Sequence, residues 1–208
     1  MKKYLFLLLL IIPVLSFSQT KYEVTPGQKG NEIVLTLSNT SSTQNISNLN
    51  VKILKSPSVL TFGTSEQTIK QLNHNEEVDV KYVFDIKRDA QVNKTDSVIF
   101  QIYSAKGISD IKKIYITYLA PKEYSLSQNF PNPFNPTTVI QYQLPSDCKV
   151  NLKVYDLLGR ELITLVNGDQ TAGFKEATFN AHGFASGVYI YCLSAGKFTS
   201  IKKMMVLK

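Results

Sequence analysis

Tryptophan is absent from the 208 residues, and histidine and cysteine occur only twice each. His74 and His182 lie far apart, and neither has a cysteine or a second histidine at metal-ligand spacing. The sequence also lacks a phosphate-binding glycine loop, a dinucleotide fingerprint and a nucleophile elbow. Because the common metal, cofactor and hydrolase motifs are missing, we expect a non-enzymatic protein without a cofactor or a metal site.

The excess of basic residues is mild. The 23 Lys and Arg residues against 16 Asp and Glu give a formal net charge of +7, to which Lys2 and Lys3 contribute. The remaining basic residues are spread over both halves of the chain and form no dense run that could neutralise a row of phosphates. Nucleic acid is therefore not expected as a partner.

Long hydrophobic runs are missing after the first fifteen residues. The apolar run at 5–15 follows two lysines, is too short to span a bilayer and is typical of a secretory signal peptide. Small side chains near its end fit the cleavage preference, so we expect a signal peptide of residues 1–18 cut between Ser18 and Gln19. An uncleaved membrane anchor is the alternative.

Short segments with alternating apolar residues dominate the first half of the mature chain. From Val78 to Ile86 every second residue is apolar, and such alternation predicts a strand with one buried and one wet face. Four more segments share this pattern: 33–37, 51–53, 98–102 and 114–118. Strands at this spacing need two sheets to bury one face each. Residues 19–121 are therefore predicted to form an immunoglobulin-like β-sandwich of about seven strands.

The composition changes in the connector after Pro121. Residues 129–136 contain three prolines and three asparagines. Proline lacks an amide donor and favours extended geometry in the residue before it, so this segment is predicted to be a rigid extended loop. We expect Phe130 and Phe134 to anchor the loop in the domain beneath it. A ligand-recognition loop is the alternative to this structural role.

A second, smaller sandwich is predicted for residues 122–208. Its strand candidates are separated by glycines at turn positions and lie at 139–144, 149–155, 161–166, 175–179, 188–193 and 198–207. The predicted fold class is thus all-β, with two immunoglobulin-like β-sandwich domains in tandem after the signal peptide. Alternation places Cys148 on the core face of its strand and Cys192 on the opposite face, which argues against a disulfide unless a bulge shifts the count.

Four motifs in this second half occur together and in a fixed order: 124–138, 154–160, 185–189 and 202–208. On these motifs, residues 122–208 resemble the type A C-terminal sorting domain of the type IX secretion system. The resemblance implies a domain that carries a folded passenger through an outer-membrane translocon of a Gram-negative bacterium. Its implied partners are the translocon and the C-terminal signal-processing machinery, with removal of the domain or attachment to surface lipopolysaccharide as outcomes. The first half more loosely resembles the immunoglobulin-like modules that precede such domains.

The last strand candidate contains the predicted recognition residues. A terminal edge strand presents unpaired backbone groups to a partner, and no tail follows it to cover that edge. We predict that residues 198–208 form the recognition element. Its key members are Lys202, Lys203, Met204, Met205, Val206, Leu207 and Lys208. The alternative is that this strand only closes the sandwich and that its lysines aid solubility.

Together these patterns predict an exported protein located on the outer-membrane surface or in the medium. Residues 19–121 would be a small structural or adhesive passenger, whose ligand the sequence does not identify. A carbohydrate-binding module is the alternative passenger, and the lack of tryptophan counts against it.

Overall fold

A computed structural model shows the fold and describes residues 8–9, 21–105, 107 and 109–208. The regular elements in these residues are all β strands, which confirms the predicted all-β class. No helix in the described part of the chain could cross a membrane. The predicted signal peptide and its cleavage site at Ser18 and Gln19 lie outside the described residues, apart from Leu8 and Leu9.

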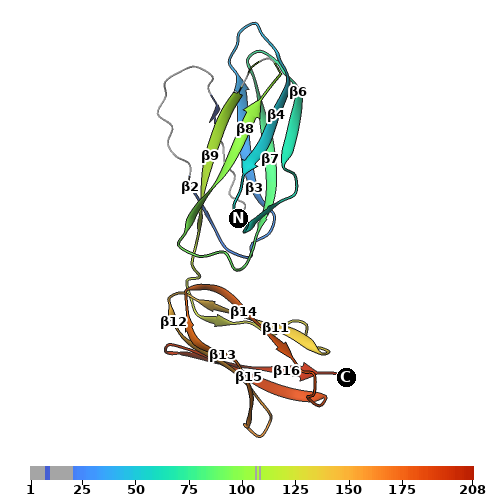
Figure 1. Cartoon of the computed structure of the whole chain (residues 1–208), viewed down its shortest axis with the longest axis vertical. Helices are drawn as coiled ribbons and strands as arrows, with labels where there is room; N and C mark the ends of the chain where they lie inside the picture. The colour runs from blue at the N-terminus through green and yellow to red at the C-terminus, as the bar shows by residue number, and fades with distance from the viewer. Residues whose placement is uncertain (1–7, 10–20, 106, 108) are drawn as a thin grey trace. The chain divides into compact units, whose positions relative to one another are not determined.

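The chain divides into two compact units, Met1–Tyr118 and Leu119–Lys208. The first unit contains two sheets, with strand orders β1-β3-β7-β5 and β2-β9-β8-β4-β6 (Figure 1). The strands are β1 Leu8–Leu9, β2 Lys21–Val24, β3 Asn31–Asn39, β4 Ile46–Lys55, β5 Leu60–Phe62, β6 Glu66–Leu72, β7 Glu76–Ile86, β8 Thr95–Tyr103 and β9 Ser109–Tyr118.

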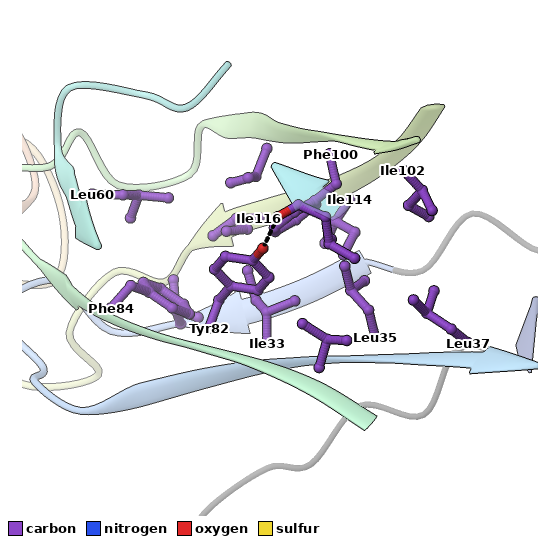
Figure 2. Packing of buried hydrophobic residues seen from close by; sticks show 14 of the residues in the cluster. Ile33, Leu35, Leu37, Leu60, Tyr82, Phe84, Phe100, Ile102, Ile114 and Ile116 are labelled. Atoms are coloured by element: carbon purple, nitrogen blue, oxygen red, sulfur yellow. Dashed lines mark hydrogen bonds between the residues drawn. The ribbon is translucent and has the colours of Figure 1, made fainter. Parts of the chain in front are cut away.

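The two sheets of the first unit bury a shared apolar core. Leu35 on β3 and Tyr82 on β7 face Phe100 and Ile114 of the other sheet (Figure 2). The Tyr82 and Phe100 rings lie 5.0 Å apart between centroids, and the Tyr82 hydroxyl donates to the Val51 carbonyl oxygen on β4 at 2.5 Å. Burial, with a smaller contribution from the charge of Glu66, raises the pKa of Tyr82 to about 12. This hydrogen bond joins the two sheets across the core.

The second unit is also a two-sheet structure, with strand orders β10-β11-β14 and β13-β12-β15-β16. Its strands are β10 Ser125–Leu126, β11 Thr137–Leu144, β12 Cys148–Tyr155, β13 Glu161–Gln170, β14 Gly173–Asn180, β15 Gly187–Ala195 and β16 Phe198–Val206. Tyr142 and Phe179 of the smaller sheet and Leu152 and Tyr191 of the larger one are among its buried side chains.

Alternation correctly predicted the opposite faces of the two cysteines. Cys148 packs against the core of the second unit. Cys192 is aligned with Lys153 on β12 and with Ile201 on β16. The side chains of these three residues lie on the outer face of the sheet, away from the core. Both thiols are free in this structure.

Candidate functional site

Strand β16 is an edge strand of the larger sheet in the second unit. It pairs with β15 in continuous antiparallel register from Phe198 to Val206, and Figure 1 marks the C-terminus just beyond it. Side chains alternate along it, because Met204 and Val206 are buried whereas Ile201 is 63% exposed. The predicted recognition residues therefore divide between core and solvent. Lys203, Met205, Leu207 and Lys208 are exposed, Lys202 is half-buried, and Met204 and Val206 belong to the core.

The expectation that nothing covers the edge of β16 is wrong for its C-terminal part. The segment 128–134, called the covering segment below, lies along this edge and hydrogen-bonds to it. The Met205 amide donates to Asn132 Oδ1 at 2.9 Å, and the Phe134 amide donates to the Met205 carbonyl at 3.0 Å. The Leu207 amide donates to the Phe134 carbonyl at 3.0 Å, and Gln128 Nε2 donates to the Lys203 carbonyl at 2.7 Å.

The cover comes from within the same unit rather than from a tail, which is why terminal position alone did not reveal it. Phe134 forms a parallel bridge with Val206, so the covering segment acts as a short added strand. The peptide bonds before Pro131, Pro133 and Pro136 are cis.

Of the two phenylalanines expected to anchor this segment, only Phe134 does so. Its side chain is 3% exposed and meets the Phe179 ring edge to face, with centroids 5.8 Å apart. Phe130 is 81% exposed, and its backbone pairs with Val139 on β11 instead. Composition could not separate the two rings, because the direction of each side chain depends on the irregular backbone between the prolines.

Asn129 holds the covering segment from inside, a role that the sequence analysis missed. The residue is 2% exposed. Its amide donates to the Tyr191 hydroxyl at 2.9 Å, and its Nδ2 group donates to the Pro131 carbonyl at 3.1 Å and to Thr138 Oγ1 at 3.0 Å. The Tyr191 hydroxyl in turn donates to the Ser127 carbonyl at 2.8 Å. Burial raises the pKa of the Tyr191 hydroxyl, and the hydrogen bond from the Asn129 amide partly opposes this shift.

The motif at 185–189 also reaches the end of the chain. The Lys208 amide donates to Ser186 Oγ at 3.1 Å, and the Tyr189 hydroxyl donates to the Ala185 carbonyl at 2.9 Å. Gly187 adopts a φ of 154°, in a region where other residues are strained. Three of the four sequence motifs, at 124–138, 185–189 and 202–208, thus meet around β16.

The fourth motif forms the tight turn between β12 and β13. Asp156 Oδ1 accepts the amides of Leu158 and Arg160, both at 2.9 Å, and Asp156 Oδ2 accepts Arg160 Nε at 2.6 Å. These bonds, led by the one from the Arg160 amide, lower the pKa of the Asp156 carboxyl. The turn is therefore fixed by its own polar groups, while Leu157 and Leu158 point into solvent at 65% and 80% exposure.

No group of three His, Cys, Asp or Glu side chains that could hold a metal ion occurs among the described residues. His74 lies in the first unit and His182 in the second. The His74 amide bonds to Asn45 Oδ1 and the His182 amide to Asn180 Oδ1, so the geometry at both positions is that of polar turns.

Comparison with known proteins identifies the region around β16. Residues 128–207, somewhat less than half of the chain, match the family model of the secretion system C-terminal sorting domain. This match begins at the covering segment and ends just after β16. No curated protein matches the chain.

Solved structures show only distant likeness. Dimeric latent PorU from Porphyromonas gingivalis is 14% identical, with 92% of this chain and 19% of that chain covered and a TM-score of 0.34. The secreted serine protease VesC from Vibrio cholerae is 13% identical, with 90% and 50% covered and a TM-score of 0.33. Domains 3 and 4 of rat CD4 are 13% identical, with 91% and 100% covered and a TM-score of 0.26. This chain spans about a fifth of the PorU chain.

Proposed function

We propose, from the premise that residues 128–207 are a sorting domain, that the second unit directs the protein through the type IX secretion system as its last export step. The sorting domain supports export to the cell surface or extracellular space. In this proposal residues 1–18 first take the chain into the periplasm of a Gram-negative cell, with cleavage between Ser18 and Gln19. Residues 122–208 are then recognised by the translocon and its signal-processing machinery.

The observation that carries the proposal is the convergence of the motifs on one strand. Segments far apart in sequence, the covering segment and Ser186, bond to residues 203–208. In this proposal the machinery recognises the exposed face of the terminal strand, which includes the predicted residues Lys203, Met205, Leu207 and Lys208. Lys202, Met204 and Val206 hold the strand in place.

The first unit is proposed to be a structural or adhesive passenger without enzymatic activity. A carbohydrate-binding face would need exposed rings that are free to stack on sugars. On the outer face of the five-stranded sheet, the Tyr103 hydroxyl donates to Glu66 Oε1 at 2.6 Å, and Lys113 Nζ lies 5.0 Å from the centroid of the Tyr115 ring. Because both tyrosines already have partners within the sheet, the structural role is the better supported of the two.

Export can be tested in a bacterium that has the type IX system. The full chain and a chain ending at Tyr118 would be expressed with the same N-terminus, and each would be assayed in periplasmic, surface and medium fractions. We expect the full chain outside the cell and the shortened chain in the periplasm. Appearance of the shortened chain outside the cell would show that the second unit is not the export signal. Intact-mass analysis of the exported protein would show whether about 85 residues are removed, as expected for a processing segment, or replaced by a surface anchor such as lipopolysaccharide.

A further inference from the structure

The covering segment hydrogen-bonds to only part of the β16 edge, and most outward backbone groups in the rest of that edge, called the open part below, make no hydrogen bond within the described residues. We propose that the open part, from Thr199 to Lys203, binds an extended acidic strand of the export machinery by β-strand addition. This inference rests on the proposed export function and deepens it, because it assigns the docking position and the chemistry of the bound segment.

Backbone direction along β16 follows from the bonds to the covering segment. Met205 directs both its amide and its carbonyl away from β15, to Asn132 and Phe134. In an antiparallel pair the residues alternate between those bonded to the neighbour and those turned away from it. The β15–β16 register has no shift, so Lys203, Ile201 and Thr199 also turn their backbone groups toward the open edge.

Most of these groups have no partner within the chain. The Lys203 carbonyl accepts from Gln128 Nε2. Within the described residues, the outward amides of Thr199, Ile201 and Lys203 and the outward carbonyls of Thr199 and Ile201 make no hydrogen bond. Three donors and two acceptors thus lie in a row at the spacing of a strand, about 3.3 Å per residue. An added strand of about five residues would satisfy all of them.

The covering segment shows that this edge accepts added backbone. Phe134 pairs with Val206 in the parallel direction, and Gln128 is the first residue of the segment to hydrogen-bond to β16. The residues before Gln128 meet β16 on its core side, where the Tyr124 and Phe198 rings stack with centroids 5.6 Å apart. A partner strand at 199–203 would therefore continue an existing pairing along the same edge. Unpaired edges of this kind are the usual sites of strand addition.

Charge and exposure define the partner strand. Lys197, Lys202, Lys203 and Lys208 lie within the last twelve residues, which contain no Asp or Glu. Lysines along an edge discourage pairing with arbitrary strands and favour an acidic one. Ile201 adds a 63% exposed apolar side chain in the middle of the open part. The matching segment is extended, acidic at several positions and apolar opposite Ile201.

The first test removes one outward amide donor and keeps the hydrogen bonds between β15 and β16. Ile201→Pro deletes a donor that faces away from β15, so the β15–β16 bonds persist, and Ile201→Val is the matched control that keeps the amide. Export of the full chain would be measured as the ratio of extracellular to periplasmic protein. We expect this ratio to fall at least about tenfold for Ile201→Pro, equivalent to about 1.4 kcal/mol of lost binding, and to stay within about twofold for Ile201→Val. Export of Ile201→Pro at the normal ratio would overturn the proposal.

Proline at position 201 could disturb the fold, and hydrogen exchange of the purified full chain would reveal this as lost protection of the β12 amides. In that case a second pair of variants tests the proposal. Ile201→Glu and Ile201→Lys each place one charge on an exposed side chain. Binding of an acidic strand predicts that the glutamate variant accumulates in the periplasm and that the lysine variant is exported. Equal export of the two, or the reverse order, would reject the acidic partner. If either result arises while the chain ending at Tyr118 still stays in the periplasm, the proposed export function stands and only this docking position fails.

Discussion

Replacement of Phe134 by alanine should destabilise the second unit by several kcal/mol, whereas the same change at Phe130 should have little effect. Phe134 is 3% exposed, and burial of a phenylalanine side chain contributes about 1.5–3 kcal/mol by transfer alone. Its removal also leaves a cavity beside Phe179 and ends an edge-to-face contact, so the total cost is about 3–5 kcal/mol. Phe130 is 81% exposed, and loss of its ring should change the free energy of unfolding by less than about 0.5 kcal/mol.

Hydrogen exchange followed by mass spectrometry on the full chain is a suitable assay, because the protein has no tryptophan and because peptides from the two units can be read separately. Phe134→Ala should lower the opening free energy of the most protected amides in β11, β12 and β15 by about 3–5 kcal/mol and leave those of β7 and β8 unchanged. Equal losses in the two phenylalanine variants, or a loss below about 1 kcal/mol for Phe134→Ala, would refute the idea that this ring anchors the covering segment.

Three further outcomes are expected. Asn129→Ala should cost the second unit about 1–3 kcal/mol in urea denaturation, because it removes the donor to the Thr138 hydroxyl oxygen and one of the two donors to the Pro131 carbonyl. A cost below about 0.5 kcal/mol would contradict this role. The folded-state pKa of Tyr82 is raised, so the stability that its protonated hydroxyl contributes is complete below about pH 10 and is lost as the pH rises toward about 12. Hydrogen-exchange protection of the β7 amides should fall over that range, and it should fall less steeply in Tyr82→Phe. The same dependence on pH in both proteins would disprove this contribution of Tyr82. The folded-state pKa of Asp156 is lowered, so the stability that its carboxylate contributes is present at neutral pH and is lost as the pH falls through that pKa. In Asp156→Asn the free energy of unfolding of the second unit should therefore fall less steeply with decreasing pH. An unchanged dependence on pH would contradict this role of Asp156.

Strands with regular alternation were predictable from the sequence. The pattern from Val78 to Ile86 corresponds to β7 at Glu76–Ile86, and the candidate at 149–155 corresponds to β12 at Cys148–Tyr155. In both strands one face is buried, and that burial fixes the period of two. In contrast, β5 has three residues, and β6 buries only Leu72 among its seven, so neither left a clear pattern in the sequence.

The candidate site was predictable in part. The terminal strand, its exposed lysines and its resemblance to a sorting domain could be inferred from residues 202–208. The cover of its edge could not, because it depends on side-chain and backbone bonds from Gln128, Asn132 and Phe134, more than seventy positions earlier. The turn-rich segment at 129–136 indicated rigidity, but which ring it buries and which strand it bonds are tertiary properties.

The bonds between the covering segment and β16 join the beginning of the second unit to its end. Gln128 and Lys203 are separated by 75 positions, and Asn132 and Met205 by 73. A ribosome synthesises the earlier member of each pair long before the later one, so these contacts form only after β16 has been synthesised. A product that terminates before β16 would have an unfinished β-sandwich, and it could not present the edge on which sorting is proposed to depend. Under the proposed function, export would therefore require an intact second unit.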